Sequence, residues 1–323
     1  MSDKSALNGW IILDKPHGLG STQAVGAVKR ALREGGYAKA KIGHGGTLDP
    51  LATGVLPIAL GEATKLAGRM LDSDKIYEFT IQFGTETDTL DLEGAVVKEC
   101  NVQPTLAQVE AVLSRFTGPI AQVPPAYSAL KVDGQRAYDL ARAGEEVVLK
   151  SRDVVVYALT MRRPRAGGGR FEDMVHNVKA APACAGATQL DTITLTAHVS
   201  KGTYIRSLAR DIAYALGTVG HVTMLHRVKA GPFTLDHAIS LDILFEKSKA
   251  RALEDITLPL RTALVDIPAL ALTPEQAGAL KQGRVLTGIA APDGLTLATL
   301  DETPVALVEC SDGTVKVERG FNL

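Results

Sequence analysis

A glycine-rich stretch at residues 43–54 contains one carboxylate, that of Asp49, and one imidazole, that of His44. Its four glycines let the backbone adopt positive φ angles and approach another chain or a ligand closely. Because Asp49 precedes Pro50, its backbone is biased towards an extended or turn conformation. A carboxylate held on such a loop is either a catalytic group or a cap for the turn or the helix that follows.

Three further side chains lie where an element begins or ends. Tyr77 begins the apolar face of an alternating stretch at 76–83, so it either packs in the core or presents its ring to a base. Arg206 opens a helix directly after an alternating strand, and its guanidinium is either solvated or reaches a neighbouring loop. Lys15 lies in a turn and is either solvated or directed at a phosphate.

The pattern of apolar residues predicts the strands and helices that position these groups. Pro57 marks the run 55–61 as an edge or irregular strand, because proline cannot donate to a ladder. The predicted strands are 10–13, 55–61, 76–83, 154–157 and 192–200, with a hairpin at 305–309 and 314–317. The predicted helices begin at Ser21 or Thr22, Glu62, Thr105 and Ile205.

Length and composition indicate a globular protein of about two domains. The chain has 323 residues, of which 46% are hydrophobic and 22% charged. No apolar run is long enough to span a bilayer, and residues 1–9 lack the apolar core of a signal peptide. Cys100, Cys184 and Cys310 lie far apart, which argues against zinc or a disulfide framework and favours a cytoplasmic location.

The net charge of −1 does not by itself indicate a nucleic-acid binder, but the charges are segregated. Residues 1–45 and 200–231 are basic, whereas residues 72–99 are acidic. If the two basic segments meet in the fold, they form a phosphate-binding face. The acidic loop at 84–94 lacks calcium-loop spacing, and His221 and His226 have no companion ligand, so no metal site is predicted.

Several separated segments resemble, in order, the motifs of the bacterial tRNA pseudouridine-55 synthases. The longest is the His-x-Gly-Thr-Leu-Asp-Pro-Leu-Ala-Thr-Gly stretch that contains Asp49. The set covers about residues 9–230, and its common order makes the resemblance specific. The other segments are 13–16, 61–65, 72–77, 125–131 and 200–206.

The resemblance implies roles for eight residues. Asp49 matches the family's essential aspartate, Tyr77 its active-site tyrosine and Arg206 the arginine that pairs with the aspartate. His44 matches the histidine at the T loop of the tRNA. The positions that match residues lining the pocket or binding RNA are Lys15, Lys65, Tyr204 and Leu225.

The implied reaction isomerises one T-loop uridine, at position 55 of tRNA, without cofactor or metal. A carboxylate acts at the ribose, either as nucleophile on C1′ or as base at C2′, and both mechanisms stay open. Burial disfavours an ionised carboxylate, so a bidentate Arg206 would keep Asp49 charged. The uridine must leave its stack, Tyr77 would stack on it or take its C5 proton, and His44 would fill the vacated space.

The resemblance implies an α+β fold with a mixed, largely antiparallel central sheet flanked by helices, the pseudouridine synthase fold. We expect a catalytic domain at 1–245, a helical linker at 246–265 and a small β-rich, PUA-like RNA-binding module at 266–323. The Arg-, Gly- and Ala-rich residues 162–190 predict a solvated insertion. The expected partner is the T arm of tRNA, bound by a monomer without guide RNA, protein partner or membrane.

Two positions depart from the family pattern. Gly45 replaces a slightly larger residue, which predicts a softer loop, and His226 replaces a common arginine, which predicts a weaker or pH-dependent phosphate contact. Three other functions stay open. They are a non-catalytic RNA chaperone that opens the tRNA elbow, a guide-RNA-dependent pseudouridine synthase, and an Asp-dependent nucleoside hydrolase that would release uracil.

Overall fold

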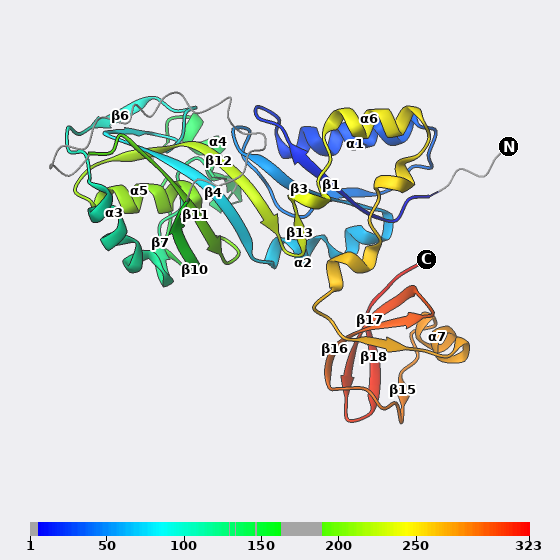
Figure 1. The fold of residues 1–323 in the computed structure, drawn as a ribbon. Coiled ribbons are helices and arrows are strands. Elements are labelled where there is room, and N and C mark those ends of the chain that lie inside the picture. Colours follow the sequence, from blue (N-terminus) through cyan, green and yellow to red (C-terminus); the bar gives the residue numbers. More distant parts are fainter. Residues whose placement is uncertain (1–5, 129, 133, 146, 163–188) are drawn as a thin grey trace. The chain divides into compact units, whose positions relative to one another are not determined.

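The structure is a computed structural model that describes residues 6–128, 130–132, 134–145, 147–162 and 189–323 (Figure 1). The predicted insertion at 162–190, with Cys184, therefore lies almost entirely outside the described residues. The chain divides into two compact units. We name them the Asp49 unit, Met1–Lys75 with Arg227–Leu323, and the Arg206 unit, Ile76–His226. The domain boundaries expected near residues 245 and 265 stay a prediction.

Three antiparallel strands form the centre of the Asp49 unit. Strand β1 (Gly9–Lys15) pairs with β3 (Thr53–Leu60), and β2 (Ile42–His44) pairs with β3. The end of β12 (Gly220–Ala230) follows β3 in the strand order and pairs with β13 (Phe233–Thr234). The apolar run of β1 is buried on both faces, as the sequence predicted for residues 10–13.

Strand β3 is internal, so the prediction of an edge strand around Pro57 was wrong. The Pro57 carbonyl accepts a hydrogen bond from Gly45 N at 2.8 Å, just past the end of the β2 pairing. In a ladder the N–H and C=O of one residue address the same neighbour. The missing N–H of Pro57 therefore faces the point where β2 ends, and β3 keeps its full register with β1.

Helices cover this sheet and close its core. Helix α1 (Ser21–Glu34) lies beside α6 (Leu241–Lys249), and Ser248 Oγ donates to the Ala31 carbonyl at 2.6 Å (Figure 1). The predicted helix at 62–71 begins instead as a 3₁₀ turn, Gly61–Leu66, before α2 (Ala67–Asp72). The other short helical turns of the unit are Leu235–His237, Leu253–Ile256 and Leu260–Leu264.

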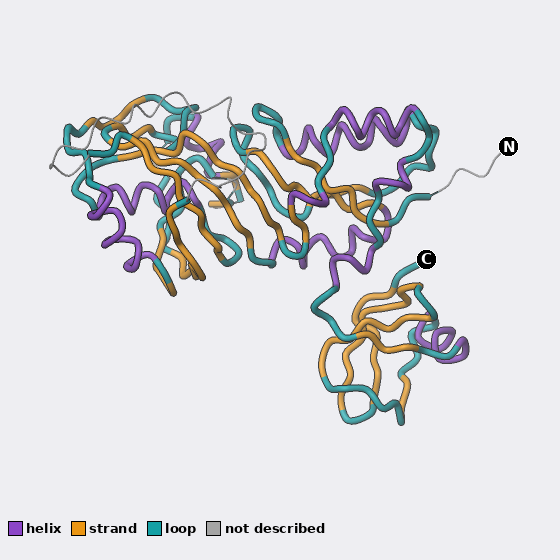
Figure 2. Tube along the Cα trace, viewed as in Figure 1, coloured by secondary structure: helices purple, strands orange, loops and turns teal. Residues whose placement is uncertain are grey.

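A five-stranded sheet forms the C-terminal part of the same unit (Figure 2), and it contains the hairpin predicted at 305–309 and 314–317. It has its own core, and its Leu297, Leu307 and Phe321 also join the cluster around Trp10. The strand order is β14-β16-β17-β18-β15, and β14 pairs parallel with β16. The elements are β14 (Ala269–Ala271), α7 (Pro274–Lys281), β15 (Leu286–Thr287), β16 (Gly294–Leu300), β17 (Thr303–Ser311) and β18 (Thr314–Gly320).

The Arg206 unit is built on strands in the order β12-β4-β11-β10-β7. Helices α3 (Leu106–Leu113) and α5 (Ile205–Ala215) pack on one face, against alternate residues of the strands (Figure 1). The Thr105 capping box that the sequence predicted is present at the start of α3. The large strands are β4 (Lys75–Phe83), β7 (Gly118–Gln122), β10 (Arg152–Met161) and β11 (Thr192–Val199).

The acidic segment predicted as a loop contains a short strand. Strand β5 (Thr85–Thr87) pairs antiparallel with β6 (Val96–Glu99). The shorter elements of this unit are a 3₁₀ turn (Ser114–Phe116), β8 (Lys131–Val132), β9 (Gln135–Arg136) and α4 (Ala137–Arg142). The expected mixed, largely antiparallel α+β architecture is confirmed. No helix among the described residues combines the length and apolarity needed to cross a bilayer.

Candidate active site

The loop that carries Asp49 is fixed by hydrogen bonds to its backbone. Ser21 Oγ donates to the Leu48 carbonyl and accepts from the Leu48 N–H, both at 2.8 Å. Gly18 N donates to the Pro50 carbonyl, also at 2.8 Å. Half-buried Asp49 therefore lies between two residues whose peptide groups are held by the start of α1 and the turn before it.

Lys15 is part of this support and is fully buried. Its ammonium donates to the carbonyls of Leu19 (2.6 Å), Pro16 (3.1 Å) and Pro50 (3.1 Å). Burial lowers the pKa of Lys15 to about 8, with opposing contributions from the Asp49 carboxylate, which raises it, and the Arg227 guanidinium, which lowers it. Neither the solvated nor the phosphate-directed interpretation from the sequence describes this internal ammonium.

Arg227 holds the other side of the loop and is 1% exposed. Its Nε donates to the Val55 carbonyl at 2.7 Å, and its terminal nitrogens donate to Gly46 (3.1 Å) and Thr47 (3.4 Å). No individual role was predicted for this arginine from the sequence, where only its neighbour His226 was singled out. His226 is itself buried, at 6% exposure.

His44 lies half-buried at the end of β2, before the Asp49 loop. Its Nδ1 accepts a hydrogen bond from Gly46 N at 3.4 Å, which places the proton of the neutral ring on Nε2. Burial and the Arg227 charge lower the pKa of His44, so the imidazole is neutral at pH 7.

Gly45 lies in close contact with its neighbours, and the softer loop expected there stays a prediction. A Cβ at this position would lie 2.6 Å from the Cβ of Met70, and the Gly45 N–H is bonded to Pro57. Met70 fills the space that a larger residue would need, so the departure from the family pattern is matched by a neighbour within this chain.

Lys65 lies at the contact with the C-terminal sheet. Its ammonium donates to Glu62 (2.7 Å) and to the Gly320 carbonyl (2.8 Å), while Asn322 N donates to Glu62 (2.7 Å). Burial raises the pKa of Glu62, but the hydrogen bonds from Lys65 and Asn322 outweigh it and the pKa is lowered. Lys65 thus fastens residues 320–322 to the turn that contains it.

In the Arg206 unit, Arg206 lies in the first turn of α5 and its side chain is 7% exposed. Its guanidinium meets Asp91 at 3.2 Å and donates to the carbonyls of Thr89 (2.7 Å) and Tyr127 (3.0 Å). Asp91 in turn accepts from Thr89 Oγ1 (2.5 Å) and Glu93 N (3.0 Å). The sequence predicted that Arg206 reaches a neighbouring loop, but Asp91 was missed, because an acidic loop gives no sign of which carboxylate is buried.

The remaining predicted residues also belong to this unit. Tyr77 and Leu225 are partly buried and pack against one hydrophobic cluster, which also contains Ile205. Tyr204 caps α5, and its backbone is held on both sides by the buried amide of Gln122, at 2.8 and 3.1 Å. In this unit Tyr77 and Leu225 thus share a cluster with Ile205, the residue between Tyr204 and Arg206, whereas Lys65 of the Asp49 unit lies at the C-terminal sheet.

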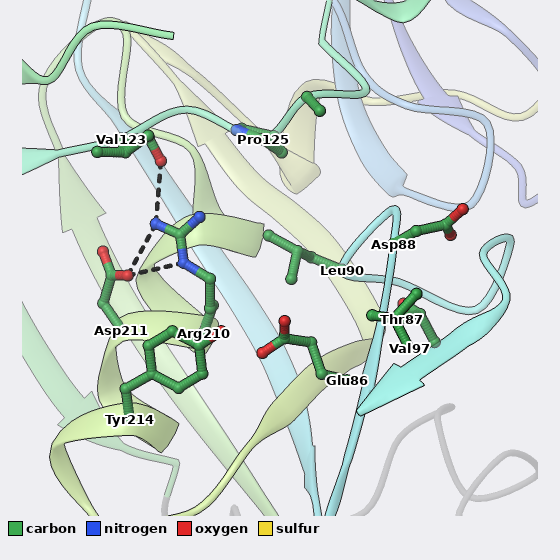
Figure 3. Close-up of a pocket in the computed structure, with 11 residues that line it drawn as sticks. Glu86, Thr87, Asp88, Leu90, Val97, Val123, Pro125, Arg210, Asp211 and Tyr214 are labelled. Atoms are coloured by element: carbon green, nitrogen blue, oxygen red, sulfur yellow. Dashed lines mark hydrogen bonds and ion pairs between the residues drawn. The ribbon is translucent and has the colours of Figure 1, made fainter. Parts of the chain in front are cut away.

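A hollow of about 460 Å³ in the Arg206 unit is lined by none of the predicted site residues (Figure 3). Three carboxylates and a single cation line it, which makes it a poor phosphate site. The cation, Arg210, is bonded to Asp211 (2.8 Å) and the Val123 carbonyl (3.0 Å). Among the described residues, no three His, Cys, Asp or Glu side chains form a group that could hold a metal ion.

Comparison with known proteins gives consistent matches along the chain. Residues 33–205 match the TruB family pseudouridylate synthase N-terminal domain, and residues 206–265 the tRNA pseudouridylate synthase B C-terminal domain. The tRNA pseudouridine synthase B of Novosphingobium aromaticivorans is 62% identical over 317 residues, covering 98% of each chain. That of Zymomonas mobilis is 54% identical over 321 residues, covering 99% of this chain and 98% of the relative.

Two solved structures share the fold at a TM-score of 0.67. One is an H/ACA RNP bound to a substrate RNA containing 2′-deoxyuridine, at 22% identity, covering 98% of this chain and 85% of that one. The other is a Cbf5-Nop10-Gar1 complex, at 24% identity, covering 97% and 85%. The family match covers more than half of the chain and the two relatives cover nearly all of it. The protein therefore belongs to the TruB family of pseudouridylate synthases.

Proposed function

We propose that this protein isomerises the T-loop uridine at position 55 of tRNA to pseudouridine. The observation that carries the proposal is the 62% identity, along 98% of the chain, to a protein named tRNA pseudouridine synthase B. Because the matched stretch covers 98% of the chain, it includes the Asp49 loop and the Arg206 segment, and it supports the same reaction in this protein.

Asp49 acts at the ribose of the target nucleotide, as nucleophile or base. Its loop is held through backbone groups on both sides, which is the preorganisation that such a step needs. Arg206 keeps the carboxylate ionised, and its own guanidinium is oriented by Asp91 before any substrate binds. Lys65, Tyr204 and Leu225 line the pocket or contact the RNA.

Flipping the uridine out of its stack costs a few kcal/mol, and stacking on an aromatic ring returns about 1–3 kcal/mol. Tyr77 supplies that ring, and neutral His44 enters the space that the base leaves. Lys29 and Arg33 are exposed on α1 and are available to phosphates of the T arm. We infer that the protein acts in the cytoplasm as a monomer, without cofactor.

A guide-RNA-dependent activity is the second candidate, because both fold neighbours come from H/ACA-type assemblies. Those neighbours are under 25% identical and support the fold alone, whereas the tRNA synthase relatives are 54–62% identical. Activity on a tRNA transcript with no other RNA or protein present would exclude the guided mechanism.

The test is pseudouridine mapping in an unmodified tRNA transcript incubated with the purified protein. The wild type should convert only the T-loop uridine, and Asp49→Asn should abolish conversion, whereas Asp14→Asn, at an exposed carboxylate of β1, should not. A wild type that forms no pseudouridine refutes the function. Full activity of Asp49→Asn refutes the role of Asp49, and release of free uracil would identify a hydrolase.

A further inference from the structure

We propose that Arg227 is a positioning residue, whose guanidinium sets the geometry of the Asp49 loop and contacts no RNA phosphate. The proposal rests on the function proposed above and adds a residue to its machinery. Arg227 belongs to the basic segment 200–231, which by charge alone was expected to contribute to a phosphate-binding face. At 1% exposure its side chain cannot serve that purpose.

Three hydrogen bonds of Arg227 join the two ends of the loop. Gly46 and Thr47 precede Asp49, and Val55 follows it at the start of the buried part of β3. A guanidinium is planar and its donors have a fixed fork geometry. The planar guanidinium therefore fixes the distance and orientation between residues 46–47 and Val55, the two stretches on either side of Asp49.

Two glycines of the loop fit closely around this residue. Gly54 has φ +97°, and a Cβ there would lie 2.3 Å from the Arg227 carbonyl oxygen. Gly46 has φ +143°, and a Cβ there would lie 3.4 Å from a terminal nitrogen of the guanidinium. Backbone and side chain of Arg227 thus both determine where the loop can run.

An ammonium could not replace this guanidinium. Lysine carries its donors on one atom, whereas the three carbonyls are met by three separate nitrogens. Within the described residues, the hydrogen-bond acceptors of Arg227 are backbone carbonyls. Its positive charge instead affects nearby titratable groups. The pKa values of His44 and Lys15 are lowered chiefly by burial and further by Arg227.

The decisive experiment compares Arg227→Lys with the wild type in single-turnover pseudouridine formation at saturating enzyme, together with tRNA Kd at several salt concentrations. We expect the saturating rate to fall about 100-fold, as for a misplacement of about 1 Å. The Kd and its salt slope should stay unchanged. Lys229→Met, a half-exposed cation on the same strand, is the matched control and should keep the wild-type rate.

An unchanged saturating rate overturns the proposal. So does a weaker Kd with a salt slope smaller by about one phosphate contact, because that would identify a phosphate ligand. If Arg227→Lys does not fold, Gly46→Ala tests the same contact by changing the loop. A lower rate at unchanged Kd supports the positioning role of Arg227, and a wild-type rate overturns it. Gly36→Ala is the control for Gly46→Ala, because Gly36 also has a positive φ (+78°) but its Cβ would meet nothing within 4 Å.

Hydrogen exchange of residues 46–55 gives a readout that needs no activity. Arg227→Lys should speed exchange in this loop while leaving the rest of the Asp49 unit protected. If exchange is faster in Arg227→Lys but the wild type forms no pseudouridine, the proposed function is refuted, while the positioning role of Arg227 is supported. Unchanged exchange in Arg227→Lys overturns the positioning role of Arg227 even if the wild type forms pseudouridine.

Discussion

Raising the pH from 7 to 9 should stabilise the Asp49 unit through Lys15. In the folded chain the pKa of Lys15 is lowered from 10.5 to about 8, mainly by burial. Between these values the unfolded chain binds a proton that the folded chain lacks, so the free energy of unfolding rises with pH. Integrating the difference in protons bound by Lys15 gives a rise in the free energy of unfolding of about 1.4 kcal/mol between pH 7 and 9. The full rise, once both states have lost the proton, is about 3 kcal/mol.

Urea unfolding followed by tryptophan fluorescence measures the stability of the Asp49 unit, to which Lys15 belongs. Trp10 is the one tryptophan of the chain, is fully buried and lies 5.4 Å from the Phe233 ring. The quantity to plot is the free energy of unfolding of the wild type minus that of Lys15→Met, because the contributions of other titrating groups cancel in this difference. It should rise with pH between 7 and 9.

A difference that stays flat or falls with pH would refute the reasoning. The pKa can also be read directly from the pH dependence of the Lys15 Cε resonance, assigned by through-bond correlations in the wild-type protein. A value near 10.5 would mean that the ammonium is not held inside its three carbonyls in solution. This second measurement decides the matter if Lys15→Met does not fold.

Three substitutions test the packing around the site. Gly45→Ala should cost about 1–3 kcal/mol, since its Cβ would overlap the methionine beneath it, while Gly43→Ala should change stability by less than about 0.5 kcal/mol; urea midpoints compare the two. Asp91→Ala should lower the free energy of unfolding by about 1.5–3 kcal/mol, because it removes one charged partner of the buried Arg206 guanidinium, whereas exposed Glu93→Ala should be neutral. Equal stabilities of the two variants, followed by circular dichroism during unfolding, would contradict this. Phe321→Ala, at 1% exposure, should cost about 3–5 kcal/mol in the tryptophan-detected transition.

Local patterns predicted the elements well where the determinants are local. The alternation in 76–83 and 192–200 became β4 and β11, and the Thr105 capping box begins α3. These features depend on periodicity and on hydrogen bonds within a few residues. Their existence could be predicted without knowing what each element packs against.

Features set by distant neighbours could not be predicted in this way. Pro57 reads as an edge residue until the end of β2 is known to meet it. The bond from Lys65 to the Gly320 carbonyl could not be predicted, because the two residues lie 255 positions apart. Asp91 looks like any acid of an acidic loop until α5 brings Arg206 against it. Sequence spacing carries no information about such contacts.

Charge counting shows the same limit. The basic segments were expected to face RNA, yet Lys15, Arg206 and Arg227 are buried and bonded to backbone carbonyls. A formal charge in the sequence does not distinguish a cation that meets solvent from one that holds a loop together. The exposed cations of the two segments, among them Lys29, Arg33 and Lys201, stay a prediction for RNA contact.

The Asp49 unit is discontinuous, since its core joins Trp10 to Phe321 while residues 76–226 form the other unit. A ribosome therefore completes the Arg206 unit first, and domains generally fold as units during synthesis. Residues 1–75 of the nascent chain, which include β1 and β3, are synthesised early. Their shared core is complete only after residue 321 has left the exit tunnel. Slow translation of the stretch after residue 226 would lengthen the time during which this apolar surface is open to protein chaperones and to aggregation.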